Sequence, residues 1–231
     1  DANNRFVALS VLADEFRDLT LGDLFARFDE KIPVSLQRYS DKNTSTWHYH
    51  NEVADQALAK RCKFANRGKL IEASLSLDKT LRAQLSPKQE AIAVALQMHL
   101  IQDLHQPLHT FTRLDKNCRS DRGGNGSCYK RGASPKSCER NLHAQWDQGF
   151  GVFDAALPKL GPYSASQLAF DPAAWVAASL HHYGDVYGLG RSGYDRRAAK
   201  IVAENAALGR ARLSAYLSFY YQQKKTHESY K

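Results

Sequence analysis

Residues 86–109 read SPKQEAIAVALQMHLIQDLHQPLH and predict the central helix of the chain. Ser86 is a favourable N-cap residue, Pro87 suits the first helical position, and Gln89 completes a capping-box arrangement. Apolar residues then recur at helical period through residues 90–108. The stretch therefore predicts a long helix that begins at a well-defined N-terminus.

The second half of this helix concentrates potential metal ligands. His99 and Asp103 are four residues apart, so an imidazole and a carboxylate can reach the same point from one helix face. His143 and Asp147 repeat that spacing further along the chain. A single His or Asp on a half-buried helix is more often a structural residue, but two such pairs favour a multinuclear metal site. Zinc suits imidazole and carboxylate ligands, and no thiolate cluster competes for the role.

Pro107 determines where the next histidines lie. It lacks a backbone donor and disfavours helical geometry at the residue before it, so we expect the helix to be disturbed there. His109 should then leave the turn above Asp103, which places that carboxylate between two metals. The spacing of His105 from Asp103 puts it on a different helix face, which favours packing or support of the ligands over ligation.

The length and composition of the chain indicate its domain number and fold class. The chain has 231 residues, 43% of them hydrophobic, and no stretch reads as an interdomain linker, so we expect residues 1–231 to form one domain. No window approaches eighteen apolar residues, so no stable membrane insertion is expected. Alternating apolar patterns are few, which predicts an all-α protein. The segments with helical period are Phe6 to Phe28, Leu70 to Leu85, Glu90 to Leu108, Ala165 to Tyr187 and Arg196 to Tyr221.

The cysteines indicate an oxidising compartment. Cys62, Cys118, Cys128 and Cys138 are an even number, and three of them lie in the Gly- and Ser-rich segment between the two ligand pairs. A separate cysteine zinc site fits less well because no C-x-x-C element is present. The pairing stays open, although one bond within the loop and one to Cys62 would use all four. The chain starts at Asp1 without a methionine, so we expect a removed signal and a secreted or periplasmic protein.

The net charge and one glycine-rich loop indicate which ligands the protein could bind. The net charge of +8 attracts polyanions such as nucleic acid or an anionic membrane face, although many basic secreted proteins bind neither. The glycines of the loop DRGGNG at 121–126 permit close approach of its backbone to a ligand. The loop lacks the lysine and hydroxyl of a nucleotide-binding motif, so an ordinary turn is the other interpretation.

Four motifs together resemble the zinc-dependent type I nucleases, the single-strand-specific nuclease and 3'-nucleotidase family that shares its fold with bacterial zinc phospholipases C. They are WHYHN at 47–51, HLIQDLHQPLH at 99–109, DRGGN at 121–125 and NLHAQWD at 141–147. The segment LADEFR at 12–17 matches a further family motif except for Leu12 in place of Trp, and residues 206–217 resemble the last family helix more loosely.

The resemblance implies a helical domain with long loops around a cleft that holds three zinc ions. It assigns Asp14, His48, His99 and Asp103 to one zinc and His109, His143 and Asp147 to a second, with Asp103 also bridging to the third. It also implies that Arg17 faces the phosphate, that Tyr49 stacks a base, and that Asn51 and Asn125 contact substrate. Without the resemblance, a core tyrosine and a helix-capping asparagine are equally good interpretations of Tyr49 and Asn51.

Two departures from the family are visible. The stretch between Asp14 and His48 is longer than usual, which suggests an insertion near Leu21 to Thr46. Family chains also begin with a Trp and a nearby His that complete the third zinc site, and no His precedes His48 here. We therefore expect about thirty N-terminal residues to be missing, and two zinc ions instead of three if they are truly absent.

Clustered metal ions that activate a water predict hydrolysis of phosphodiester bonds by attack on phosphorus. The resemblance implies the finer activity, that of a zinc-dependent endonuclease and 3'-nucleotidase that converts single-stranded DNA and RNA to 5'-mononucleotides. Stacking on Tyr49 requires an unpaired base, which explains a single-strand preference. Arg17 and Asp103 are the expected catalytic residues, and a monomer is the family default. The alternatives are a zinc phospholipase C acting on phospholipid head groups, or a catalytically impaired relative that binds zinc or nucleic acid.

Overall fold

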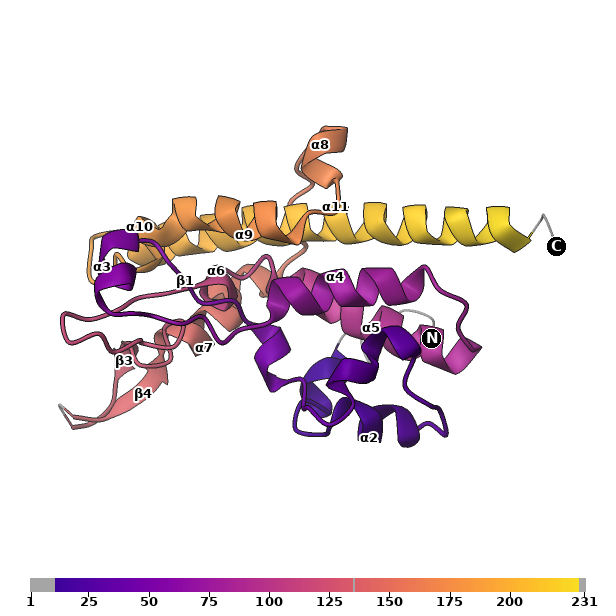
Figure 1. Cartoon of the computed structure of the whole chain (residues 1–231). Coiled ribbons are helices and arrows are strands. Elements are labelled where there is room, and N and C mark those ends of the chain that lie inside the picture. The colour runs from indigo at the N-terminus through magenta and orange to yellow at the C-terminus, as the bar shows by residue number, and fades with distance from the viewer. Residues whose placement is uncertain (1–10, 135, 229–231) are drawn as a thin grey trace.

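Three helices form the frame of the molecule in the computed structural model, which describes residues 11–134 and 136–228. They are α4 (Leu70–Leu81), α5 (Pro87–Asp103) and α11 (Tyr194–Glu228), and α5 packs against both of the others. Figure 1 shows α11 running along one side of the molecule, with α4 and α5 beneath it.

The remaining elements are short. The other helices are α2 (Leu21–Ala26), α3 (Gln56–Arg61), α6 (Pro107–Thr110), α7 (Leu142–Asp147), α8 (Ala165–Leu168), α9 (Pro172–Ser179) and α10 (Tyr183–Val186). The 3-10 helices are η1 (Val34–Tyr39), η2 (Ser45–His48), η3 (Gly149–Asp154) and η4 (Leu180–His182). Strands β1 (Glu52–Val53) and β2 (Phe111–Thr112) pair in parallel, and β3 (Cys128–Arg131) and β4 (Cys138–Asn141) form an antiparallel hairpin. The fold is mostly helical, as the sequence predicted.

The central helix begins as its sequence indicates. The Ser86 side chain accepts a hydrogen bond from the Gln89 backbone, the Gln89 side chain bonds back to the Ser86 backbone, and Pro87 occupies the first turn. These contacts satisfy donors that a helix end otherwise leaves unpaired. The helix ends at Asp103, and α6 starts afresh at Pro107.

The apolar core consists of two clusters. The larger surrounds α4 and α5, and it includes the fully buried Leu77 and Ile101. The smaller lies between α6, α7 and α11 around Leu108 and Trp146. Since Leu104 belongs to the first cluster and Leu108 to the second, the break in the helix lies where the two clusters meet.

The segment that the sequence suggested as an insertion, Leu21 to Thr46, contributes to the larger cluster. Leu21, Phe25 and Leu36 have no measurable exposure and lie in that cluster. The segment therefore supports the helix that carries His99 and Asp103.

The helical predictions need correction at their boundaries. The segment predicted over 70–85 ends earlier, because α4 stops at Leu81, and the one over 90–108 runs instead from Pro87 to Asp103. The period from Phe6 to Phe28 is not one helix: residues 11–15 are helical, a turn follows, and α2 restarts where Thr20 accepts a hydrogen bond from the Asp23 backbone. The part before residue 11 lies outside the described residues. The period over 165–187 divides into α8, α9, η4 and α10. Conversely, the last helix begins earlier and ends later than 196–221.

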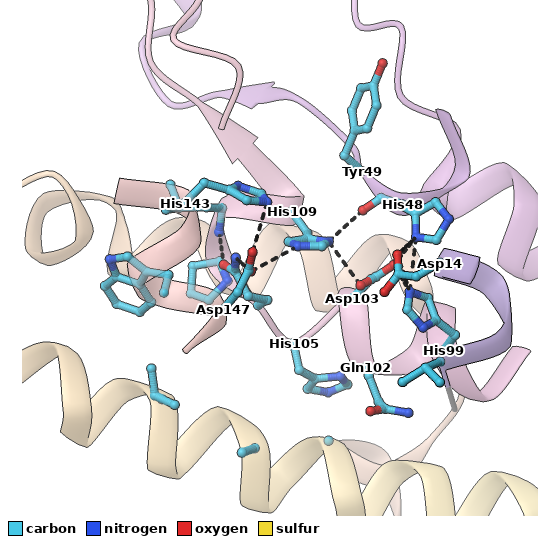
Figure 2. Close-up of a pocket in the computed structure, with 18 of the residues that line it drawn as sticks. Asp14, His48, Tyr49, His99, Gln102, Asp103, His105, His109, His143 and Asp147 are labelled. Carbon is cyan, nitrogen blue, oxygen red and sulfur yellow. Dashed lines mark hydrogen bonds and ion pairs between the residues drawn. The ribbon is translucent and has the colours of Figure 1, made fainter. Parts of the chain in front are cut away.

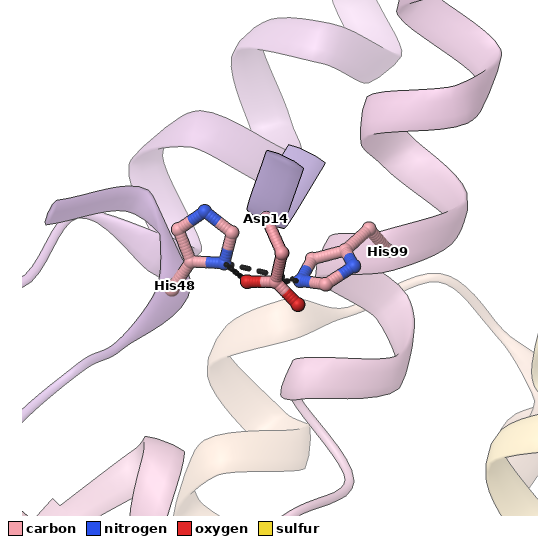
Figure 3. Close-up of side chains that lie close together, drawn as sticks. All are labelled: Asp14, His48 and His99. Carbon is pink, nitrogen blue, oxygen red and sulfur yellow. Dashed lines mark hydrogen bonds and ion pairs between the residues drawn. The ribbon is translucent and has the colours of Figure 1, made fainter. Parts of the chain in front are cut away.

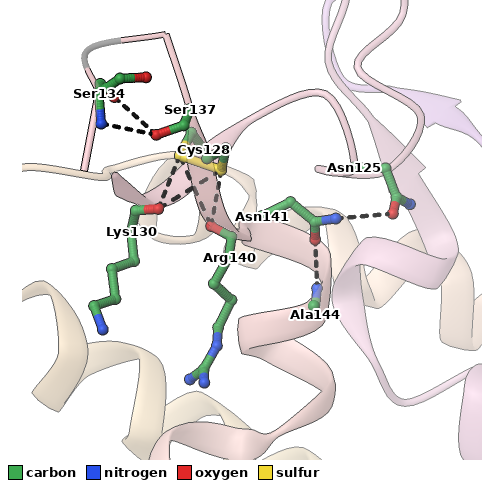
Figure 4. The surroundings of a disulfide bond; sticks show 9 residues. Asn125, Cys128, Lys130, Ser134, Ser137, Arg140, Asn141 and Ala144 are labelled. Atoms are coloured by element: carbon green, nitrogen blue, oxygen red, sulfur yellow. Dashed lines mark hydrogen bonds between the residues drawn. A yellow bond between two sulfur atoms is a disulfide. The ribbon is translucent and has the colours of Figure 1, made fainter. Parts of the chain in front are cut away.

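All four cysteines are paired. One disulfide joins Cys62 to Cys118, and the other joins Cys128 to Cys138 across the β3–β4 hairpin (Figure 4). This is the arrangement of one bond within the loop and one to Cys62 that the sequence left open. The hairpin itself was not expected. Among the described residues, no helix has both the length and the apolar character needed to cross a membrane.

Candidate metal centre

One cavity of about 1270 Å³ collects the expected ligands from segments far apart in the chain. Figure 2 shows them as a row from His99 and His48, through Asp103 and His109, to Asp147 and His143. The residues come from the first described helical turns, η2, α5, α6 and α7, and α11 forms part of the opposite wall.

The first group of candidate ligands contains Asp14, His48 and His99. Their side chains converge in Figure 3, with Nδ1 of His48 3.0 Å from Nε2 of His99. Oδ1 of Asp14 lies 3.5 Å from the His48 nitrogen and 3.7 Å from the His99 nitrogen. Oδ2 of Asp103 lies 3.2 Å from each of the same two nitrogens.

These distances fit a tetrahedral zinc ion. Bonds of about 2.0–2.1 Å to nitrogen and oxygen give tetrahedron edges of about 3.3–3.4 Å. The five distances in the first group fall around that value. Asp103 is buried, and its Oδ2 has no hydrogen-bond partner, so a cation between these atoms would satisfy a polar group whose burial is otherwise costly.

The second group contains His109, His143 and Asp147. Nε2 of His109 lies 3.4 Å from Oδ1 of Asp147, and Nε2 of His143 lies 3.5 Å from Oδ2 of the same carboxylate. The two imidazole rings are stacked, with centroids 4.8 Å apart.

Backbone carbonyls orient both rings of the second group. Nδ1 of His109 donates to the His48 carbonyl at 2.7 Å, and Nδ1 of His143 donates to the Gly123 carbonyl at 2.7 Å. With Nδ1 engaged in this way, each Nε2 is directed at Asp147. A histidine held through one nitrogen in this way presents the other as a metal ligand.

Asp103 connects the two groups. Its Oδ1 lies 3.1 Å from Nδ1 of His109, while its Oδ2 faces the first group. Burial favours the neutral carboxyl, but the charge and hydrogen bond of His109 outweigh it and hold the pKa of Asp103 well below its usual range. Burial likewise opposes a charged His109, but the nearby Asp103 carboxylate raises the pKa of that imidazole well above its usual range. The row therefore holds its carboxylate ionised inside the protein.

Local pairing positions His48 against His109. Trp47, the residue before His48, is buried in the larger cluster with its ring 5.3 Å from that of Tyr39. The backbone of His50 donates to the His109 carbonyl at 2.6 Å, and β1 and β2 pair directly afterwards. The chain segments that carry the two histidines are thus held together on both sides.

The glycine loop at 121–126 approaches α6 closely. Gly123 has a φ of +60°, and a Cβ at this position would lie 2.3 Å from the Leu108 carbonyl oxygen. Glycine is therefore required for the loop to present its carbonyl to His143. Next to it, the Asn125 side chain accepts a bond from Asn141, which caps α7 through the Ala144 backbone (Figure 4).

Comparison with known proteins agrees with this geometry. A family model described as S1/P1 nuclease matches residues 1–184. The chain belongs to the S1/P1 nuclease family. The family acts on phosphodiester bonds of nucleic acids, so the cavity is the candidate active site of a hydrolase. A comparison with curated proteins found no match.

The four residues that were expected to contact substrate in this S1/P1 family member all line the cavity. They are Arg17, Tyr49, Asn51 and Asn125. Tyr49 stands beside His48 at one edge of the ligand row (Figure 2). The Asn125 amide also donates to the Arg122 carbonyl, so it helps to shape the loop. Contact of these residues with substrate stays a prediction.

His105 lies next to the row but points away from it. Its Nδ1 donates to the Ile101 carbonyl at 2.6 Å, and its Nε2 accepts from the Arg212 guanidinium at 2.9 Å. Burial lowers the pKa of this imidazole to about 4, so it is neutral at neutral pH. Both ring nitrogens are therefore engaged by α5 and α11 instead of by either ligand group.

Two residues of the cavity were missed by reasoning from the sequence. Gln106 accepts from the Leu108 backbone and donates to Oδ1 of Asp147 at 2.7 Å, so it both caps α6 and orients a candidate ligand. Its place directly before Pro107 was the available signal, because proline at the first helical position calls for a capping residue before it. Phe153 lines the cavity with 54% of its surface exposed, and nothing in its sequence context marked it.

Proposed function

We propose that this S1/P1 family member is a zinc-dependent endonuclease and 3'-nucleotidase that hydrolyses single-stranded DNA and RNA to 5'-mononucleotides. The observation that carries the proposal is the pair of ligand groups joined by Asp103 within one cavity. The comparisons establish the coarser statement, a hydrolase of the nuclease family.

The ligand types favour zinc. The two groups combine imidazole nitrogens with carboxylate oxygens, include no sulfur, and have spacings near those of a tetrahedral site. Asp14, His48, His99 and Asp103 would hold one ion, and His109, His143 and Asp147 a second. When bound, such ions lower the pKa of a water and stabilise the oxygens that attack and leave phosphorus. A third ion stays a proposal that rests on the family resemblance.

The other residues of the cavity supply binding and orientation. Arg17 is exposed at the cavity and carries no ion pair among the described contacts, so its guanidinium is available to a phosphate. Tyr49 offers an aromatic face at the edge of the row, and Asn51 offers an amide next to it. A base held between these groups must be unpaired, which supports preference for single strands.

The disulfides and the apolar core bear on the protein's location and on its assembly. Two disulfides support a secreted or periplasmic location, because such bonds persist in oxidising compartments. We propose a single domain, since both apolar clusters contribute residues next to the same cavity. We also propose a monomer, on the family resemblance.

One observation favours a second candidate, a zinc phospholipase C. Part of the cavity wall is apolar and includes Val11, Leu157 and Leu213. That wall could receive the apolar part of a lipid beside its head-group phosphodiester. The three arginines that line the cavity, Arg17, Arg122 and Arg210, and the net charge of +8 favour a polyanion instead.

Substrate comparison tests the proposal. Zinc-loaded protein is incubated separately with single-stranded DNA, single-stranded RNA, duplex DNA and phosphatidylcholine vesicles, and the products are separated by chromatography. The proposal expects 5'-mononucleotides from both single strands, slower release from the duplex, and loss of all hydrolysis in EDTA. Release of phosphocholine without nucleotides would establish the phospholipase instead, and no hydrolysis of any substrate would indicate an impaired relative.

A further inference from the structure

We propose that Phe153 is a second base-stacking site, which binds the base of a nucleotide flanking the phosphodiester bond that is cut. The inference rests on the proposed function and deepens it, because it describes how the site would hold a strand longer than one nucleotide. Tyr49 and Phe153 would stack two bases of the same single strand.

Phe153 is unusual among the exposed apolar residues because of where it lies. Several large apolar side chains are exposed elsewhere on the surface, and single ones need no explanation. Phe153, however, lines the same cavity as both ligand groups and follows α7, the helix of His143 and Asp147, within η3. An exposed aromatic ring in the candidate active-site cavity can pack against the substrate.

The backbone before Phe153 is held in place by packing. Phe150 and Gly151 both have positive φ, at 52° and 83°. A left-handed conformation is unfavourable for phenylalanine, and it persists only where surrounding contacts impose it. The Phe150 ring makes those contacts, 5.4 Å from the ring of Trp146 and 6.0 Å from that of Tyr194. The turn that carries Phe153 to the cavity is therefore anchored in the smaller apolar cluster.

The Phe153 ring also has a defined seat. It rests over Gly149, where an added Cβ would lie 2.5 Å from the ring atom Cε2. Gly149 has a φ of +66°, so glycine serves both the backbone and the close contact. A ring seated on the backbone in this way loses little conformational freedom when a base stacks on it.

The part of the cavity lined by η3 and α11 suits a nucleotide better than a neutral ligand. Arg210 is exposed on α11, lines the same cavity and donates to the Pro158 carbonyl at 3.3 Å. Helix α11 also packs against η3. Among the described residues that α11 and the segment after α7 contribute to the cavity, Arg210 is the charged one. An aromatic face and an arginine within one cavity are the combination that single-strand-binding proteins use for base and phosphate.

In sequence, the two rings follow ligands of the two different groups. Tyr49 directly follows His48 of the first group, and Phe153 follows Asp147 of the second. A strand that stacks one base on each ring would place a phosphate between them, over the row centred on Asp103. Binding at both rings would thus position the bond to be cut.

Binding measurements test the proposal independently of catalysis. Zinc-loaded protein is titrated with a phosphorothioate-linked thymidine decamer, which resists hydrolysis, and with decamers that carry one abasic position. Fluorescence anisotropy gives the Kd for the unchanged protein, for Phe153→Ala, for Phe153→Tyr, and for Phe219→Ala. Phe219 is a matched control because its ring is 50% exposed on α11 and does not line the cavity.

The expected result is a Kd roughly fivefold to a hundredfold higher for Phe153→Ala, the range of one lost stacking contact. The tyrosine variant and the Phe219 variant should retain the original Kd. One abasic position should weaken binding by the unchanged protein but not further weaken binding by Phe153→Ala, because both changes remove the same contact. An unchanged Kd for Phe153→Ala would overturn the proposal. So would additive losses of binding free energy from Phe153→Ala and from the abasic position, wherever in the decamer that position lies. Tight binding without any hydrolysis of an ordinary decamer would instead overturn the proposed function.

Discussion

Asp103 and His109 are joined across the break between α5 and α6, with Oδ1 of Asp103 3.1 Å from Nδ1 of His109. The same imidazole directs its Nε2 at Asp147, whereas the other oxygen of Asp103 faces His48 and His99. One carboxylate therefore contacts a first group of candidate ligands directly and orients a histidine of the second. Carboxylates that orient metal-binding histidines raise their basicity and affect metal affinity.

Gln106 should control zinc binding in the second group. Gln106→Ala removes the hydrogen bond to Asp147, and we expect zinc affinity there to fall about 10- to 100-fold, the usual effect of losing such a partner. Competition with a chromogenic chelator measures the affinity. Gln102→Ala is the control, since Gln102 lines the same cavity but donates to the Met98 carbonyl. A lower melting temperature with unchanged zinc affinity would show that Gln106 only caps α6.

Gly68 should control the position of Tyr49. An added Cβ at Gly68 would lie 2.1 Å from the Tyr49 carbonyl oxygen and 2.7 Å from its ring. Gly68→Ala must therefore displace Tyr49, and we expect KM for single-stranded DNA to rise at least roughly fivefold, the lower range of one lost stacking contact. The zinc content should not change.

Gly184→Ala provides the comparison for that variant. A Cβ at Gly184 meets nothing within 4 Å, so this change should leave KM unaltered. Equal KM values for the two variants would contradict a role of Tyr49 in substrate binding.

Tyr194 should stabilise the smaller apolar cluster. Its hydroxyl accepts from the Trp146 indole at 3.0 Å and donates to the Val186 carbonyl at 2.8 Å, and all three residues are buried. Tyr194→Phe leaves both partners unsatisfied, which costs about 1–3 kcal/mol for each buried polar group. Urea unfolding of the zinc-loaded protein measures the change, with Tyr221→Phe on the exposed surface as control. A free energy of unfolding within about 0.5 kcal/mol of the original would contradict this role.

The sequence predicted which candidate metal ligands lie together better than it predicted the helix boundaries. The four-residue spacing of His99 with Asp103, and of His143 with Asp147, depends only on helix geometry, and α5 and α7 preserve it. Proline at 107 likewise acts locally, so the break before His109 could be expected.

Other features depend on contacts between distant segments. The periodicity of apolar residues cannot show that a new helix begins at Thr20. The Thr20 side chain accepts a hydrogen bond from the Asp23 backbone, and this local bond competes with continuation of the preceding helix. The periodicity also cannot show that Phe150 adopts a left-handed conformation, since the rings of Trp146 and Tyr194 impose it. The role of Phe153 follows from that turn and was invisible for the same reason.

The most direct test measures zinc content and hydrolysis together in the unchanged protein and in Asp103→Asn. The account predicts at least two zinc ions per chain and zinc-dependent cleavage of single-stranded DNA by the unchanged protein. In Asp103→Asn, cleavage should fall by at least about a hundredfold, because even outer partners of metal ligands are worth about 10- to 100-fold. Circular dichroism should show that the variant keeps its helices. Full cleavage by Asp103→Asn, or cleavage that persists after zinc is removed, would contradict the account.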